Sequence, residues 1–114
     1  MYRISSITLA KFARKLALEK KALNPVILDM RKLTTVSDFF LILTAESEPQ
    51  IKAILNHIEK EIKQKYIISP RIDGHPCSKW VIMDYDNVVV HIFDKEKRSY
   101  YSLETLWGDA PHIS

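Results

Sequence analysis

Three short runs of nearly unbroken apolar residues constrain the fold of this chain more than any other feature of its sequence. They cover residues 26–30, 39–44 and 88–93. A half-exposed strand alternates polar and apolar residues, so unbroken runs of this length are typical of strands that are buried on both faces. The last run has one polar member, His91, and we expect it to form a central strand of a sheet.

Two amphipathic segments are predicted to form helices that pack on this sheet. In residues 6–23 the apolar side chains recur at helical spacing, and most of the basic side chains fall outside that stripe. We expect the Asn-Pro pair at 24–25 to end this helix, because a residue before proline avoids helical backbone angles. The second helix is expected to begin at residues 47–50, where serine, proline and glutamine match a capping box, and to end at about residue 65.

The remaining segments are shorter. Residues 66–72 are predicted to form an edge strand, because they contain a proline that cannot donate a hydrogen bond to a neighbouring strand. Residues 73–78 have the composition of a loop. We expect 80–85 to form a hairpin with the strand that follows, through a tight turn at Asp86-Asn87, and 102–107 to form a short helix.

The predicted order of elements is helix, two strands, helix, three strands and a short helix. This order indicates an α/β (mixed α+β) fold, with about five strands in a mixed sheet flanked by helices. The chain has 114 residues, and we expect one domain over residues 1–114, because two independent cores are hard to build from so few residues.

Basic residues are concentrated near the start of the chain. Residues 1–24 carry six basic side chains and one acidic side chain, although the formal net charge of the whole chain is only +3. This segment either contacts an anionic partner such as RNA or is a solvated helix face. The apolar runs are shorter than the roughly 18 residues of a membrane span, and a single cysteine excludes an internal disulfide. We therefore expect a cytoplasmic protein without a membrane segment.

The polar clusters that suggest chemistry are incomplete. Asp73, His75 and Cys77 lie close together, but a structural zinc site takes four ligands and no second cysteine exists. Ser37 and Asp38 stand where a nucleotidyltransferase would have its Gly-Ser pair, but the two carboxylates that would hold Mg²⁺ do not follow them. We therefore expect no catalytic residues, no metal and no cofactor.

Two ring-bearing side chains have two interpretations each. His91, in an apolar strand, is either a histidine whose nitrogens are satisfied by neighbouring groups or a functional side chain. Trp80, at the start of a strand, either belongs to the core or anchors an interface, where tryptophan is enriched. The exposure of the Trp80 ring distinguishes between the two interpretations of that residue.

The chain resembles a known family along most of its length. Residues 28–31 and 37–42 match a first signature, and residues 80–85, 88–93 and 98–111 match a longer second one. Together these motifs are similar to those of the ribosomal silencing factor family, whose members are also called Iojap-related proteins.

Two positions depart from the pattern of that family. Asp86 stands where the family usually has a glycine between two strands, and aspartate tolerates the same backbone angles. Pro49 stands where the family usually has an arginine, so no role of that arginine is carried over to this chain.

The resemblance implies a binding protein and not an enzyme. Members of the family bind the large-subunit ribosomal protein L-fourteen, block joining of the small ribosomal subunit and thereby repress translation, and they form homodimers. Their fold is similar to a degenerate nucleotidyltransferase sheet. Two alternatives remain: a general RNA-binding module, whose basic N-terminal helix would contact rRNA, and a nucleotidyltransferase-like enzyme.

From this resemblance we expect a partner-binding surface with Trp80 as its main anchor, because a few buried aromatic side chains carry most of the affinity of an interface. Carboxylates beside it would meet the basic surface of a ribosomal protein. The expected partner-binding residues are Trp80, Asp84, Tyr85, His91, Arg98, Tyr101 and Glu104.

Overall fold

A computed structural model describes residues 4–33, 37–97 and 110–113, which form two long helices and a six-stranded mixed sheet. The elements are α1 (Ser6–Glu19), β1 (Leu23–Asp29), β2 (Phe39–Ala45), α2 (Glu48–Tyr66), β3 (Arg71–His75), the 3₁₀ turn η1 (Pro76–Ser78), β4 (Trp80–Asp84), β5 (Val88–Asp94) and β6 (His112–Ile113). The strand order across the sheet is β3-β4-β5-β2-β1-β6. The mixed α+β architecture predicted from the sequence is confirmed.

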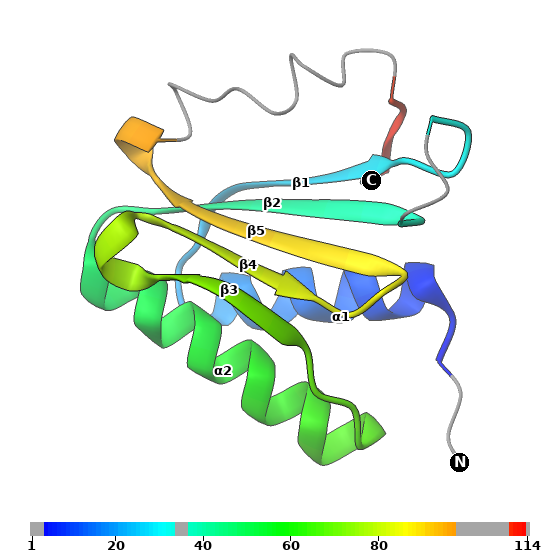
Figure 1. The fold of residues 1–114 in the computed structure, drawn as a ribbon, viewed down its shortest axis with the longest axis horizontal. Helices are drawn as coiled ribbons and strands as arrows, with labels where there is room; N and C mark the ends of the chain where they lie inside the picture. The colour runs from blue at the N-terminus through cyan, green and yellow to red at the C-terminus, as the bar shows by residue number, and fades with distance from the viewer. Residues whose placement is uncertain (1–3, 34–36, 98–109, 114) are drawn as a thin grey trace.

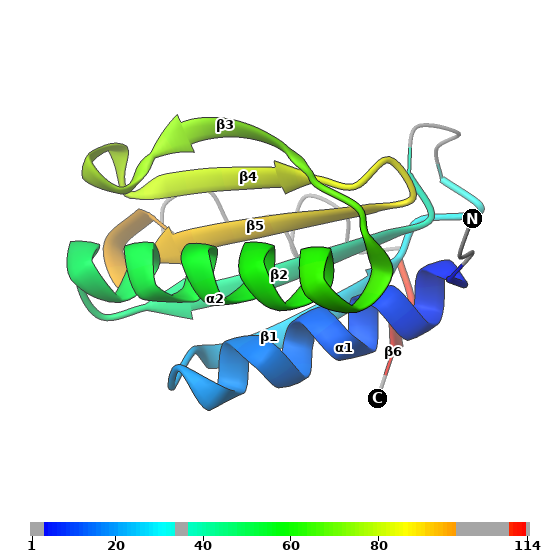
Figure 2. The ribbon, with the colours of Figure 1, turned by 90° about the horizontal axis from the view of Figure 1, so that it is seen from below.

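The two helices lie side by side against one face of the sheet (Figure 1), and Figure 2 shows this helix layer from its outer side. The central strands β2 and β5 run parallel, whereas the other neighbouring strands are antiparallel. All residues of β5 are buried, as expected for a central strand. The sixth strand, β6, was not predicted, because two residues are too few to form a recognisable pattern.

Helix α1 ends earlier than predicted. Ser5 caps its start by accepting a hydrogen bond from the Thr8 backbone N–H, but its last residue is Glu19 and not residue 23. Lys21 takes a left-handed backbone conformation, with φ of 65°, and turns the chain into β1. The Asn-Pro pair at 24–25 therefore lies inside β1, at an irregularity of the pairing with β2, where a missing proline N–H is tolerated.

Helix α2 begins as predicted, with Ser47 accepting a hydrogen bond from the Gln50 backbone N–H at 3.3 Å. The Gln50 side chain does more than a capping box requires. Its oxygen accepts from the Glu46 N–H at 2.6 Å, and its nitrogen donates to the carbonyls of Lys20 and Lys21 at 3.2 and 2.8 Å. Gln50 thus joins the start of α2 to the end of α1.

The edge strand is displaced from its predicted position. The predicted strand 66–72 is wrong for most of its length, because α2 continues to Tyr66 and Ile67 ends it in a left-handed conformation. Strand β3 instead covers part of the predicted loop 73–78, and it is an edge strand. Strand β3 can follow this course because residue 74 is glycine: its φ is 85°, and a Cβ there would collide with the Trp80 carbonyl oxygen.

Buried apolar residues form two clusters, one on each face of the sheet. The larger cluster fills the space between the sheet and the two helices. The smaller one lies on the face opposite α1 and α2 and contains Leu28, Met30, Ile42, Phe93 and Ala110. Trp80 and Phe40 pack against this second cluster from β4 and β2.

Candidate functional site

The face of the sheet opposite α1 and α2 carries Trp80 and His91, the two ring-bearing side chains with two interpretations each. Successive side chains of a strand point to opposite faces, so Trp80 and Ile82 of β4 lie on the same face as His91 and Phe93 of β5. The antiparallel register places Trp80 opposite Phe93 and Ile82 opposite His91. These pairs bring the two rings that had ambiguous interpretations into one site.

Four rings form what we call the aromatic cluster: Phe40, Trp80, His91 and Phe93. The Trp80 and Phe93 rings stack with centroids 4.9 Å apart, and the Phe40 and His91 centroids are also 4.9 Å apart. The indole nitrogen of Trp80 donates a hydrogen bond to Nδ1 of His91 at 3.3 Å. Trp80 is half-buried, so the inner part of its ring packs on the core while the remainder stays accessible.

His91 is deeply buried in this cluster and uncharged at neutral pH. Its residue is 7% exposed, and burial lowers its pKa to about 4. Because Nδ1 accepts the Trp80 hydrogen bond, the ring proton lies on Nε2. Among the residues that the structure describes, Nε2 has no hydrogen-bond partner. His91 therefore orients the Trp80 ring while one of its own polar atoms remains unsatisfied.

Asp84 is held at the hairpin end of β4 by its neighbours. One carboxylate oxygen accepts a hydrogen bond from the Asp86 backbone N–H at 2.8 Å, and the other forms an ion pair with Arg71 at 3.0 Å. Burial raises the pKa of this carboxyl, but the two hydrogen bonds outweigh burial and hold the pKa below its ordinary value. Asp86 takes a left-handed conformation, with φ of 70°, as expected for the turn.

Tyr85 lies on the opposite face of the sheet from the aromatic cluster. Its residue is 8% exposed and packs in the core between the sheet and the helices. Burial, together with the charge of Glu59, raises the pKa of the phenol, whose oxygen has no partner among the described residues. Three other expected partner-binding residues, Arg98, Tyr101 and Glu104, lie outside the described residues, as does the predicted short helix at 102–107.

The polar pair at the start of β2 has structural partners. The Ser37 hydroxyl is buried and lies within hydrogen-bond distance of the Phe39 and Asn87 carbonyls, at 3.0 and 3.1 Å. The Asp38 carboxylate accepts a hydrogen bond from the Ser6 hydroxyl at 2.8 Å, which fastens the start of α1 to the sheet. Both side chains are therefore engaged in holding elements together.

The cluster that suggested a metal site is also engaged locally. Nδ1 of His75 accepts a hydrogen bond from the Cys77 backbone N–H at 3.1 Å, and this bond caps η1. The same nitrogen lies 3.1 Å from the Cys77 sulfur. Within residues 4–33, 37–97 and 110–113, no three His, Cys, Asp or Glu side chains converge to hold a metal ion. Over the same ranges, no helix is long and apolar enough to cross a membrane.

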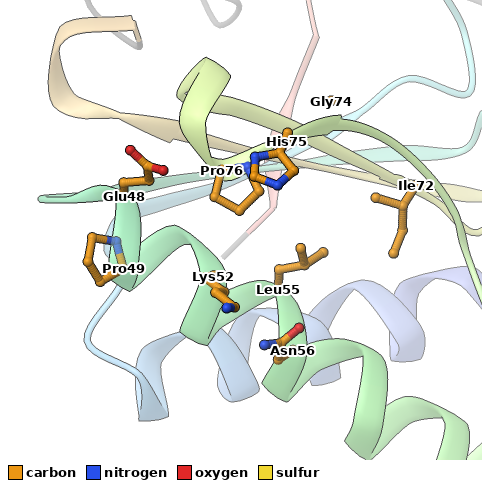
Figure 3. Close-up of a pocket in the computed structure, with 9 residues that line it drawn as sticks. All are labelled: Glu48, Pro49, Lys52, Leu55, Asn56, Ile72, Gly74, His75 and Pro76. Carbon is orange, nitrogen blue, oxygen red and sulfur yellow. The ribbon is translucent and has the colours of Figure 1, made fainter.

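A groove that the sequence did not predict lies between α2 and the edge of the sheet (Figure 3). Its volume is about 670 Å³, and its walls are mainly apolar. The lining residues are Glu48, Pro49, Lys52, Leu55, Asn56, Ile72, Gly74, His75 and Pro76. It opens on the helix side of β3, so it is separate from the aromatic cluster.

Comparison with known proteins identifies a family model and relatives that share one description. A family model described as "Ribosomal silencing factor during starvation" matches residues 3–114. Ribosomal silencing factor RsfS of Halalkalibacterium halodurans is 42% identical over 95 residues, which cover 83% of this chain and 81% of that protein. Ribosomal silencing factor RsfS of Bacillus subtilis is 38% identical over 104 residues, which cover 91% of this chain and 88% of that protein. A crystal structure of a Chromobacterium violaceum protein superposes with a TM-score of 0.87 at 30% identity, covering 92% of this chain and 88% of that one.

Proposed function

Because the chain belongs to the ribosomal silencing factor family, we propose that it docks on ribosomal protein L-fourteen of the large subunit and blocks joining of the small subunit. Membership of this family implies that the chain associates with ribosomes and regulates translation. Docking at this position accounts for silencing by occupancy alone, since a bound body of 13.3 kDa excludes a competing surface by its volume.

The aromatic cluster carries this proposal. An interface of standard size buries roughly 1,200–2,000 Å² in total, and a few aromatic side chains supply most of its affinity. Trp80 has the properties of such an anchor, since its ring is half-buried, stacked on Phe93 and fixed in orientation by His91. A ring that is already ordered loses little conformational freedom when it binds.

The charged edge of the same face supports docking on a basic protein. Asp84 is half-buried at the hairpin end, and its carboxylate is kept ionised by Arg71 and the Asp86 N–H. An ordered carboxylate at the other end of the strand that carries the aromatic anchor would help to orient a basic partner. We keep Arg98, Tyr101 and Glu104 as proposed members of this surface, whereas Tyr85 contributes through the core.

Binding measurements with purified large subunits and isolated L-fourteen test the proposal. Trp80→Ala should weaken both interactions by about 30-fold, the loss expected at an interface hot spot of ~2 kcal/mol. Ile67→Ala, which removes an exposed apolar side chain on the helix side, is the matched control and should bind normally. Sucrose-gradient profiles should show subunit joining restored by Trp80→Ala only. Normal binding by a folded Trp80→Ala protein would refute the anchor assignment.

We further propose that the protein acts in the cytoplasm, as one domain and without catalytic turnover, metal or cofactor, and that it forms a homodimer when free. The structural roles of Ser37 and Asp38 support the non-catalytic part of this proposal. Asp84 and Asp86 have the two-residue spacing of a carboxylate pair that could hold Mg²⁺, but both accept hydrogen bonds from Arg71. Calorimetry with ATP and Mg²⁺ should give no binding heat, and saturable binding would favour the nucleotidyltransferase-like alternative.

A further inference from the structure

Exposed lysines of both helices share the outer surface of the helix layer. Lys11 and Lys15 lie four residues apart on the side of α1 away from the sheet, and Lys60 and Lys63 occupy the equivalent side of α2. Because the two helices run side by side over one face of the sheet (Figure 2), these side chains form one surface, which we call the lysine face.

Within the described part of the chain, none of the four lysines of the lysine face is fixed in an ion pair, although Glu19 and Glu59 lie four residues from Lys15 and Lys63. Of the glutamates of the helices, Glu19 bonds to His57 at 2.8 Å, Glu59 and Glu61 are half-buried, and Glu48 lies in the first turn of α2, away from Lys60 and Lys63. The ion pairs of Asp29, Asp84 and Asp94, by contrast, all belong to the sheet and its ends.

The arrangement costs stability within α1 itself. Like charges four residues apart on a helix repel each other, and Lys11 and Lys15 have this spacing. This repulsion is about 0.2–0.5 kcal/mol, and Glu19, four residues after Lys15, offsets part of it. The role suited to four unpaired, solvated ammonium groups is binding of an extended polyanion.

We propose that the lysine face binds the phosphate backbone of RNA without reading its base sequence. Lysine ammonium groups bind phosphates as point charges, and their binding releases counterions from the RNA. The lysine face and the aromatic cluster lie on opposite sides of the sheet, so one molecule can engage RNA and a protein together. That this RNA is rRNA of the large subunit rests on the function proposed above.

The apolar faces of the helices favour RNA over a membrane surface as the partner. A helix that lies on a membrane inserts an apolar face into it, but those of α1 and α2 are buried against the sheet. Among the described residues of the helix layer, the large apolar side chains that are exposed are Leu18 on α1 and Ile67 at the end of α2. Two such side chains are too little apolar area to hold the protein on a bilayer.

Salt-dependent binding of a fluorescently labelled 20-nucleotide single-stranded RNA of mixed sequence tests this proposal. Four phosphate contacts predict a log–log salt slope of about −3, so that affinity falls roughly 50-fold between 50 and 200 mM KCl. The quadruple variant K11Q/K15Q/K60Q/K63Q should lose most of this slope. The pairs K11Q/K15Q and K60Q/K63Q should each lose about half of it.

Matched controls separate local contacts from net charge and from the proposed function. K32Q/K95Q removes the same charge as either pair, from exposed lysines outside the helix layer, and should keep the wild-type slope. Trp80→Ala should bind RNA normally, even though it loses docking on the ribosomal protein. An unchanged slope in the quadruple variant, an equal loss in K32Q/K95Q, or tighter binding to phosphatidylglycerol vesicles than to RNA would overturn the proposal.

Discussion

Acidification should destabilise this protein through His91, and the structure sets the size of the effect. The buried imidazole has a pKa of about 4 in the folded protein, against 6.5 for an ordinary histidine. The unfolded chain therefore binds a proton at pH values where the folded chain does not. The stabilisation is complete above pH 6.5 and is lost as the pH falls towards 4. The difference corresponds to about 3 kcal/mol in the free energy of unfolding.

Urea denaturation between pH 7 and pH 4 measures this loss, with His91→Gln as the reference variant. The glutamine oxygen can still accept the Trp80 hydrogen bond, but the side chain does not titrate. The difference in free energy of unfolding between the two proteins should change by about 3 kcal/mol over this interval. The carboxylates of Asp29 and Asp84, whose pKa values lie below the ordinary 3.8, lose their contribution at lower pH.

Protonation should also alter the docking surface, because an added proton on Nδ1 removes the acceptor for the Trp80 indole. Indole fluorescence should change with the same midpoint as the imidazole signal in NMR titration of the folded protein. A His91 midpoint near 6.5, or equal pH dependence in His91→Gln and the wild type, would refute the reasoning from burial.

Three substitutions test other parts of the structure. Gln50→Ala removes three side-chain hydrogen bonds, two of which join the start of α2 to the end of α1, and should lower the free energy of unfolding by about 1–2 kcal/mol in urea; an unchanged midpoint would contradict that role. Tyr85→Phe removes a buried hydroxyl without a described partner, so stability should be unchanged or higher by up to ~1 kcal/mol, and a clear loss would reveal a bonded hydroxyl. It should also abolish the destabilisation above about pH 10 that the raised Tyr85 pKa predicts, since the unfolded chain releases that proton first. Gly74→Ala should cost about 1–3 kcal/mol, because its Cβ meets the Trp80 carbonyl and its φ is positive; calorimetry showing an equal melting temperature would contradict this contact.

The elements that could be predicted from the sequence are those with independent signals at both ends or along their length. Helix α2 has a serine cap, an early proline and a regular apolar face, so its start was located correctly. The end of α1 was misplaced because Pro25 is accommodated at a strand irregularity and does not stop a helix there. Strand β3 was misplaced because its residues are all exposed and therefore lack a burial pattern.

The site was predictable in part. Trp80 and His91 were both singled out from the sequence, but their hydrogen bond depends on the register between β4 and β5, which no local pattern gives. The position of Tyr85 was available from strand periodicity, since a residue five positions after Trp80 points to the opposite face. The periodicity of β4 therefore contradicts the expectation that Tyr85 and Trp80 belong to one surface. Gln50 was recognised as a cap, but its bonds to Lys20 and Lys21 depend on how the helices pack.

The parallel pairing of β2 with β5 determines when during synthesis the aromatic cluster can assemble. Phe40 and His91 meet only because strands about fifty positions apart in the chain lie next to each other, and such distant pairings form late in folding. A nascent chain halted before β5 leaves the exit tunnel thus lacks the assembled ring surface. The surface that we propose for docking is therefore absent until β5 has emerged from the ribosome.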